Sequence, residues 1–326
     1  MPQKLLEFYA DRPAVTGFVS RLIKEVPSPR EYVSCNLCGT NRPVPYMQLG
    51  QFRVVRCANC SLIYVNPRLD DQQYRDLYSS DGYFLAGFDA EGKQHNCLEE
   101  AQTKKRDLVY ELDAVESLPG GRILDIGCGL GFLLEQLSSR WIRYGCDYSQ
   151  FAVDYCKRKG LGTLYHGDLF DLKLDDDFFD VVSARYVLEH LKDPGRFLSE
   201  IRRILKPGGR LVVSVPNWGG LCAKLFGEFF RLNSPEEHIY WFTRSSLTSY
   251  LAKNGFEIER VAYPYFRTSY FNAKELWHFL ERLTLLKVVM PLGMIVRARL
   301  NQCVISPPFY GNIIMVVARK QAPDTV

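Results

Sequence analysis

Short apolar runs alternate with helically spaced segments from Arg122 to Lys320. Runs such as RILDIGC (122–128) and DVVSARYV (180–187) are typical of buried strands, and so is RLVVSVPN (210–217), which follows an expected turn at KPGG (206–209). FAVDYCKRKG (151–160) instead has the spacing of a helix. Strands that alternate with helices predict a parallel sheet with helices on both faces. Ligands bind such sheets at the carboxyl ends of the strands, so we expect a site where the first of these runs ends.

Four of the ten cysteines form two C-x-x-C pairs near the N-terminus. Cys35 and Cys38 are separated from Cys57 and Cys60 by 18 residues, a spacing typical of a zinc site with four thiolate ligands. Four thiolates would complete a tetrahedron and leave no position for water, which predicts a structural rather than a catalytic Zn²⁺. The alternative is four unrelated buried thiols.

Composition and charge describe an ordinary soluble globular chain. Of its 326 residues, 47% are hydrophobic and 24% are charged, and the formal net charge is only +4. A dedicated nucleic-acid-binding protein would be more basic, with its charge clustered. The first residues lack the continuous apolar stretch of a signal peptide, and no run of about 18 apolar residues predicts a spanning helix. We therefore expect a cytoplasmic protein.

A glycine-rich stretch, LDIGCGLGF (124–132), ends the first predicted strand. It lacks the Gly-Lys-Ser/Thr of a P-loop, and Phe132 occupies the place of the last glycine in a dinucleotide-binding fingerprint. What remains is Asp125 followed by Gly127, Gly129 and Gly131 at every second position. A carboxylate at this point would repel a pyrophosphate, so it favours a cationic ligand.

With this loop and three later stretches, the chain resembles the class I S-adenosylmethionine-dependent methyltransferases. The later stretches are YGCDYS (144–149), HGDLFDL (166–172) and the run from Phe179 to Asn217, in the order and spacing of the family. The resemblance covers residues 120–319 and implies an α/β, Rossmann-like sheet of seven strands, closed by an antiparallel strand at 312–320. It also implies that the chain is an enzyme, with S-adenosylmethionine as its methyl donor.

The resemblance implies a set of residues that bind the methyl donor. Asp147 would accept hydrogen bonds from the ribose hydroxyls, and Asp168, with the backbone N–H of Leu169, would meet the adenine ring. Tyr83 matches the place of a tyrosine that closes over the methyl donor in related proteins; alternatively, it is a surface aromatic residue. The predicted set is Asp125, Gly127, Gly129, Gly131, Phe132, Asp147, Tyr148, Asp168, Leu169, Arg185 and Tyr83.

Residues beyond the fourth predicted strand are candidates for the methyl-transfer chemistry. A general base helps if the acceptor is a hydroxyl or an acidic C–H group, and histidine titrates near neutral pH. The candidates are His190, His238, Glu189 and Tyr186. The alternatives are that His190 packs against the core and that His238 is a loop residue bonded to the backbone.

The ribbon ahead of the predicted sheet resembles the arrangement in methyltransferases of sugar-nucleotide and natural-product pathways. It implies a small-molecule acceptor: a sugar or sugar nucleotide, a lipid-linked molecule or a natural-product intermediate, methylated on oxygen or carbon. The alternative is an RNA methyltransferase whose ribbon contacts RNA, although the near-neutral charge argues against a nucleic-acid partner. A third interpretation, a non-catalytic binding protein, is disfavoured by the intact Asp125, Asp147 and Asp168.

These observations predict three regions along the chain. Residues 1–66 would hold the zinc ribbon at about 33–66, and residues 120–326 the S-adenosylmethionine-binding domain. Residues 67–119 would form a helical linker, with a short helix near 71–78 and helical spacing within 98–118, and a lid over the methyl donor. Inserts at about 217–238 and 265–308 would shape the acceptor pocket. Apolar and basic residues interleave over 276–300, which indicates a peripheral membrane or lipid contact, an internal cap or a homodimer face.

Overall fold

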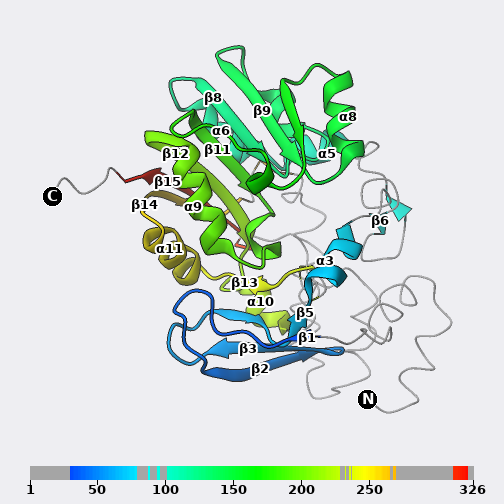
Figure 1. Ribbon diagram of the computed structural model, residues 1–326, viewed down its shortest axis with the longest axis vertical. Coiled ribbons are helices and arrows are strands. Elements are labelled where there is room, and N and C mark those ends of the chain that lie inside the picture. The colour runs from blue at the N-terminus through cyan, green and yellow to red at the C-terminus, as the bar shows by residue number, and fades with distance from the viewer. Residues whose placement is uncertain are drawn as a thin grey trace.

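A seven-stranded sheet forms the centre of the larger part of the molecule (Figure 1). The computed structural model describes residues 30–78, 87–88, 94–95, 101–227, 232, 235, 237–264, 267–268 and 311–321. The strand order is β10-β9-β8-β11-β12-β15-β14. Pairing from β10 to β12 is parallel, and β15 is antiparallel to both of its neighbours, which confirms the expected α/β fold. The strands are β8 Gly121–Ile126, β9 Trp141–Asp147, β10 Thr163–His166, β11 Phe179–Arg185, β12 Leu205–Pro216, β14 Phe256–Ala262 and β15 Ile313–Lys320.

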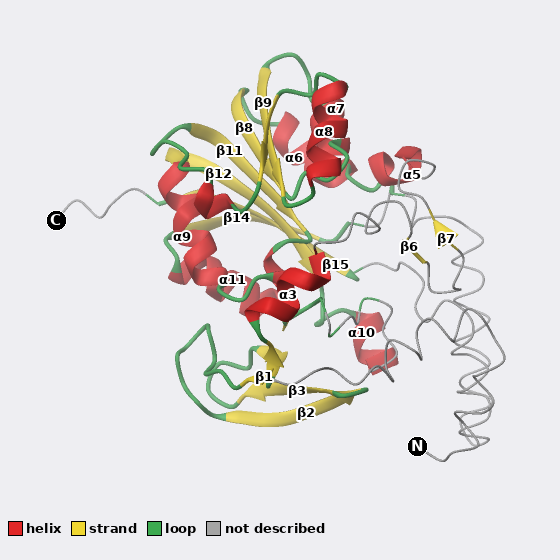
Figure 2. Ribbon diagram, turned by 45° about the vertical axis from the view of Figure 1, so that its right-hand side comes forward, coloured by secondary structure: helices red, strands yellow, loops and turns green. Residues whose placement is uncertain are grey.

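Helices cover both faces of this sheet (Figure 2). On one face lie α6 (Val109–Glu116), α7 (Phe132–Gln136) and α8 (Gln150–Arg158), and on the other lie α9 (Pro194–Ile204) and α11 (Arg244–Lys253). Helix α11 begins at a capping box in which Thr243 and Ser246 each accept the other's backbone N–H. The helical stretch expected within 98–118 is two helices, because α5 (Ala101–Arg106) ends before α6 begins.

The alternation of side chains along the strands divides the core into two layers. On β8, Ile123 packs with the layer under α6, α7 and α8, whereas its neighbour Leu124 packs with the layer under α9 and α11. The same division separates Val181 from Val182 on β11. Because every second side chain faces the opposite side, strands buried on both faces must be continuously apolar, as the sequence pattern indicated.

Strand β12 starts earlier than the sequence pattern predicted. We expected residues 206–209 to form a turn before a strand at 210–217, but the strand begins at Leu205. In the pairing register, Phe179 faces Leu205 and Val181 faces Arg210, so residues 206–209 lie opposite the single residue Asp180. The turn is therefore an irregularity inside β12. Pro207 lies in this irregular part, outside the regular hydrogen-bonded ladder, where its lack of an N–H donor is tolerated.

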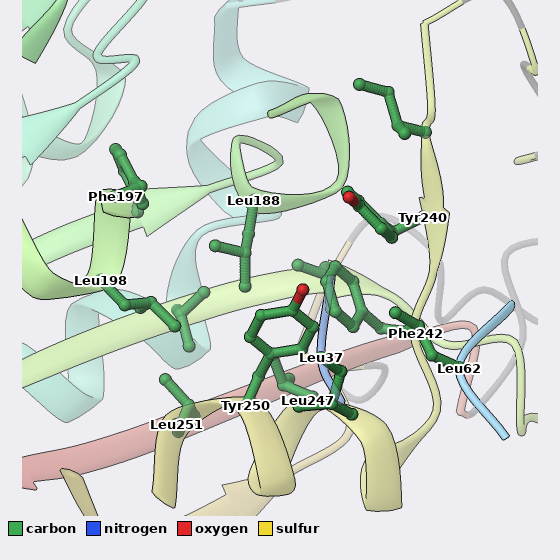
Figure 3. Close-up of a cluster of buried hydrophobic side chains, with 14 of the residues drawn as sticks. Leu37, Leu62, Leu188, Phe197, Leu198, Tyr240, Phe242, Leu247, Tyr250 and Leu251 are labelled. Carbon is green, nitrogen blue, oxygen red and sulfur yellow. The ribbon is translucent and has the colours of Figure 1, made fainter. Parts of the chain in front are cut away.

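The four-cysteine segment forms a separate sheet with the order β13-β4-β3-β2. Strands β2 (Pro43–Leu49), β3 (Phe52–Cys57) and β4 (Ile63–Val65) come from this segment, but β13 (Tyr240–Trp241) comes from beyond β12. The ribbon sheet therefore takes its edge strand from outside the predicted range of 33–66. In Figure 3, Leu37 and Leu62 of the ribbon lie against Leu188, Phe242 and Tyr250, so the two parts share one apolar core.

Shorter elements complete the part of the chain that the structure describes. Strands β1 and β5 pair with each other, as do β6 and β7, and the helix expected at 71–78 is present as α3. The short elements are β1 Arg30–Glu31, β5 Arg68–Leu69, α3 Asp71–Tyr78, β6 Gly87–Phe88, β7 Gln94–His95, η1 Leu169–Asp171, η2 Leu188–His190 and α10 Leu221–Phe226.

Some predictions fall outside the described residues. Tyr83 and the segment 276–300 are among them, so the expected lid and the expected membrane or dimer contact stay predictions. Within the described residues, no helix has the length and apolar character needed to cross a bilayer.

Candidate active site

The glycine-rich loop follows the carboxyl end of β8 and has three glycines in the left-handed backbone conformation. Gly127, Gly129 and Gly131 have φ values of 68°, 51° and 71°, a region that favours glycine. A Cβ atom at Gly127 would lie 2.7 Å from Val187, and one at Gly131 would lie 2.4 Å from Leu161. Gly131 is therefore required for packing of the loop against the protein interior, in addition to its backbone conformation.

Asp125 lies near the end of β8, opposite Ser183 in the register with β11, and is only 6% exposed. Burial raises the pKa of its carboxyl group to about 7, an effect that the nearby Ser183 only partly offsets. Asp147 raises the pKa further because the two carboxylates repel each other, and Arg185 lowers it. A cation placed beside Asp125 would relieve this cost.

Asp147 closes β9 and anchors the glycine-rich loop. Its Oδ2 accepts the backbone N–H of Gly129 at 2.8 Å, and its Oδ1 accepts that of Ser149 at 2.9 Å. Burial nevertheless raises the pKa of this carboxyl group. Each carboxylate oxygen has a second lone pair, so the anchored side chain can still accept hydrogen bonds from a ligand. Tyr148, the next residue, is 55% exposed.

Asp168 caps the short helix η1 after β10. Its Oδ1 accepts the backbone N–H of Phe170 at 3.0 Å, while the side chain of Leu169 is buried. Phe132 begins α7 directly after Gly131 and is partly exposed. The predicted residues on β8, β9 and β10 thus lie at the carboxyl ends of three adjacent parallel strands.

The buried Asp125, the half-buried Asp147 and the turned backbone fit S-adenosylmethionine. Burial, and to a lesser extent Asp147, raises the pKa of Asp125, and the positive sulfonium and ammonium groups of this molecule would favour its charged form. A phosphate group at the same place would add a third negative charge. The chemistry of the site therefore agrees with the prediction made from the glycine-rich loop.

Arg185, at the end of β11, is held by a residue that the sequence analysis missed. Its Nε lies 3.1 Å from Oε1 of Glu111, which is 1% exposed, and its guanidinium group lies 4.4 Å from the ring centre of Tyr186. The hydroxyl of Ser214 also donates to Oε1 of Glu111, at 2.7 Å. A signal was present, because Glu111 stands three residues after Leu108, on the apolar face of the predicted helix.

Tyr186 turns the chain away from β11 toward η2. Its φ of 56° is unusual for a residue with a side chain, and its backbone N–H donates to the carbonyl of Ser214 at 2.8 Å. A strained conformation at the end of a central strand is a frequent feature of functional sites. The turn brings the next three residues into the short helix η2.

Glu189, His190 and His238 form one cluster although they are far apart in the sequence. One side-chain ligand atom from each lies within 4.8 Å of the others, and the two imidazole rings have centres 4.7 Å apart. Nδ1 of His190 donates to the carbonyl of Glu237 at 3.1 Å, and Nδ1 of His238 donates to the carbonyl of Leu232 at 3.0 Å. Each ring therefore keeps its lone pair on Nε2.

Burial shifts the pKa values of all three groups in this cluster toward the neutral forms. It raises the pKa of Glu189 to about 8 and lowers the pKa of His238 to about 4. The pKa of His190 is also far below its usual value because of burial and the neighbouring His238. The structure thus unites three of the four predicted catalytic residues, and the fourth, Tyr186, stands on the turn that leads to Glu189 and His190.

The ribbon sheet braces this cluster through backbone hydrogen bonds. The N–H of Val65 in β4 donates to the carbonyl of Ile239 at 3.0 Å, and the N–H of Ile239 donates to the carbonyl of Glu189 at 2.8 Å. His238 is therefore held between the ribbon and η2. An additional bond at 3.0 Å joins Nε1 of Trp218 to the hydroxyl of Tyr46 in β2.

The four cysteines of the ribbon converge on one point. The Sγ atoms of Cys35 and Cys60 are 3.4 Å apart, those of Cys38 and Cys57 are 3.5 Å apart, and all four lie within 4.8 Å of one another. Zn–S bonds of about 2.3 Å place tetrahedral sulfur atoms roughly 3.8 Å apart. The donor set and its spacing therefore fit a tetrahedral thiolate site.

Comparison with known proteins agrees with this geometry. The profile of a methyltransferase domain family matches residues 97–261. A probable S-adenosylmethionine-dependent methyltransferase of Mycolicibacterium smegmatis is 34% identical over 160 residues, which is 48% of this chain and 59% of that protein. The ubiquinone biosynthesis O-methyltransferase of Bradyrhizobium diazoefficiens is 33% identical over 167 residues, 46% of this chain and 63% of that protein. The chain thus spans less than two thirds of the length of either relative.

The chain is also similar to a solved structure, that of the magnesium protoporphyrin IX methyltransferase of Synechocystis PCC 6803 with bound SAH. It is 18% identical, with a TM-score of 0.48, and the match covers 77% of this chain and all of that one. The family match, which extends over half of the sequence, includes β8 to β12 and the glycine-rich loop. This chain belongs to the methyltransferase domain family and is a class I S-adenosylmethionine-dependent methyltransferase.

Proposed function

We propose that this enzyme methylates an oxygen or an acidic carbon atom of a small-molecule acceptor. The acceptor class would be a sugar or sugar nucleotide, a lipid-linked molecule or a natural-product intermediate. The observation that carries this proposal is the Glu189–His190–His238 cluster, whose first two members follow β11 at the carboxyl edge of the sheet. The name of the ubiquinone biosynthesis O-methyltransferase to which the chain is similar also describes a small molecule.

The residues at the ends of β8, β9 and β10 would hold the methyl donor. S-adenosylmethionine supplies, when bound, a methyl group on a positively charged sulfur. Asp125 would offset the positive charge, Asp147 would accept from the ribose hydroxyls, and Asp168 with the N–H of Leu169 would meet the adenine. The remaining members of the proposed set are Gly127, Gly129, Gly131, Phe132, Tyr148, Arg185 and Tyr83.

The cluster beyond β11 would remove the proton of the acceptor. Both imidazoles are neutral at pH 7 with a lone pair on Nε2, so either can accept a proton. Burial makes an isolated imidazolium unfavourable, but Oε1 of Glu189 lies 3.9 Å from Nε2 of His190 and can supply the opposite charge. Tyr186 would orient the acceptor from the same turn.

The four thiolates would bind a structural Zn²⁺. Cys35, Cys38, Cys57 and Cys60 leave no open coordination position, and the metal would add its binding energy to the apolar core that the ribbon shares with the rest of the chain. The ion would hold the ribbon sheet together, and through Val65 and Ile239 the position of His238.

A specific observation also favours the second candidate, an RNA methyltransferase. Two arginines of β3 stack on exposed aromatic rings: Arg53 lies 5.8 Å from the ring centre of Tyr32, and Arg56 lies 5.9 Å from that of Tyr46. Arginine and aromatic side chains together suit phosphate contact and base stacking. The mild net charge of +4 makes this the weaker candidate.

Binding of the methyl donor is the first test. S-adenosylhomocysteine affinity would be measured by calorimetry for the wild type, for Asp147→Ala and for the exposed control Asp175→Ala. We expect Asp147→Ala to weaken binding by about a hundredfold, since hydrogen bonds to a charged group contribute roughly 1.5–3 kcal/mol each. Equal affinities in the wild type and Asp147→Ala would contradict the proposed position of the ribose.

Transfer of a labelled methyl group is the second test. The acceptors would be a panel of sugar nucleotides and a cell extract, each with and without ribonuclease. Label in small molecules that survives ribonuclease supports the proposal. Label confined to ribonuclease-sensitive material would replace it with the RNA methyltransferase.

A further inference from the structure

The cluster beyond β11 contains a carboxylate whose surroundings are unusual. Glu189 is 1% exposed, and neither of its side-chain oxygens has a hydrogen-bond partner among the described residues. Leaving a buried carboxylate without a partner is costly, so such groups are normally paired with a cation or bound to a metal. Nε2 of His190 lies 3.9 Å from Oε1 across the cluster, and the positive charge of Arg185 also acts on this carboxyl group.

The orientation of the two imidazoles is that of metal ligands. A histidine that binds a metal through one ring nitrogen usually donates its other N–H to a carbonyl or carboxylate. Here both Nδ1 atoms donate to backbone carbonyls, those of Glu237 and Leu232, and both Nε2 atoms carry the lone pair. Two histidines fixed in the same tautomer next to one buried carboxylate form a coherent donor set.

We propose that Glu189, His190 and His238 bind one divalent cation through a carboxylate oxygen and two Nε2 atoms. Bonds of about 2.0–2.2 Å to a common ion place ligand atoms roughly 3–3.6 Å apart. The observed atoms, all within 4.8 Å of one another, reach that spacing by small side-chain rotations. Imidazole and carboxylate ligands suit Zn²⁺, Mn²⁺ or Fe²⁺.

This site differs from the four-cysteine site in having room for a further ligand. Three protein atoms leave at least one coordination position open, which is the arrangement of a catalytic rather than a structural site. The part of the cluster that solvent reaches is imidazole, since the side chain of His190 is 14% exposed and that of Glu189 only 1%. An acceptor hydroxyl could therefore approach from the histidine side.

The role of the cation rests on the proposed function. A divalent cation beside the acceptor would lower the pKa of its hydroxyl and orient its oxygen. With the cation bound, His190 and His238 would act as its ligands in place of the base role proposed above. The acceptor hydroxyl, with its pKa lowered by the cation, would release its proton to water. The presence of the ion can be measured without any methyl transfer, so the two proposals can fail separately.

Mn²⁺ binding followed by electron paramagnetic resonance tests the site. The protein is first loaded with Zn²⁺ and freed of excess metal, and Mn²⁺ is then added. Mn²⁺ prefers oxygen and nitrogen ligands to thiolates, so it does not report on the ribbon. We expect about one bound Mn²⁺ per chain in the wild type. If Zn²⁺ already fills both sites, metal analysis should instead give about two zinc ions per chain.

Three variants locate the bound ion. Glu189→Gln and His238→Gln, which keep most of the side-chain volume, should each weaken Mn²⁺ binding at least tenfold or lose the second zinc ion. Mutating even a residue that only hydrogen-bonds to a metal ligand typically lowers metal affinity about 10–100-fold. The control, His166→Gln, removes a histidine outside the cluster and should bind as the wild type does.

Two results would overturn the inference: a wild type with only the ribbon ion under both protocols, or equal binding in all variants. Calorimetry with S-adenosylhomocysteine on the same samples shows that each variant is folded. Intact binding of S-adenosylhomocysteine without a second metal would remove the cation and leave the methyltransferase proposal in place.

Discussion

The substitution Asp125→Asn should stabilise the ligand-free enzyme at neutral and alkaline pH. The pKa of Asp125 is about 3.8 in an unfolded chain and about 7 in the folded protein, where the carboxyl group is buried. Between these values the folded chain keeps a proton that the unfolded chain has lost. The free energy of unfolding therefore falls as the pH rises from about 4 to 7, and levels off above 7.

The size of this effect follows from the shift. Three pKa units correspond to about 4 kcal/mol, of which roughly 2–3 kcal/mol is lost between pH 5 and pH 8. Asparagine has a similar shape and does not ionise. The wild type should thus lose about 2–3 kcal/mol of stability relative to Asp125→Asn when the pH rises from 5 to 8.

Urea unfolding without any ligand, at pH 5, 6.5 and 8, measures this difference. Other groups that titrate in the same range, such as Glu189, are present in both proteins, so their contributions cancel. A difference between the two proteins that does not change with pH would refute the argument that Asp125 is held in an unfavourable charged state. The same variant should bind S-adenosylmethionine more weakly, because it no longer offsets the positive charge.

Two further predictions concern the ribbon and the glycine-rich loop. Cys57→Ser should lose one zinc ion per chain by metal analysis and lower the melting temperature; a metal-free wild type that melts identically with and without a chelator would contradict the zinc site. Gly131→Ala should lower the melting temperature by several degrees, since its Cβ would lie 2.4 Å from Leu161 and its φ is 71°; Gly160→Ala, with no atom within 4 Å of its Cβ, is the control for a positive φ alone. An equal loss in both variants would show that the contact with Leu161 is unimportant.

The sheet could be predicted because its signals are local. Each strand is a short apolar run, each helix has its own spacing, and the chain order of these elements leaves few topologies open. The cysteine spacing is also a local signal, and the four sulfur atoms do converge. The expected turn at 206–209 was placed outside β12 because sequence alone does not show that the ladder resumes on both sides of it.

Features that depend on long-range contacts were missed or only half predicted. Strand β13 has two residues, too few for any periodic pattern, and it is a strand only because β4 offers an unpaired edge. Glu111 was hidden inside a helical pattern, and its partner Arg185 is 74 residues away. His190 and His238 were named as separate candidates, but their contact depends on backbone bonds that join η2 to Ile239.

The pairing of β4 with β13 limits which segments such an enzyme can exchange with its relatives by recombination. A ribbon grafted onto another protein without residues 239–242 would expose the backbone of β4, and an exposed strand edge invites pairing with other chains and aggregation. Removal of the ribbon from this chain would leave Tyr240 and Trp241 without a strand to pair with. Recombination between relatives is therefore expected to preserve both pieces as a single inherited unit, even though Tyr240 stands 175 positions after Val65 in the sequence.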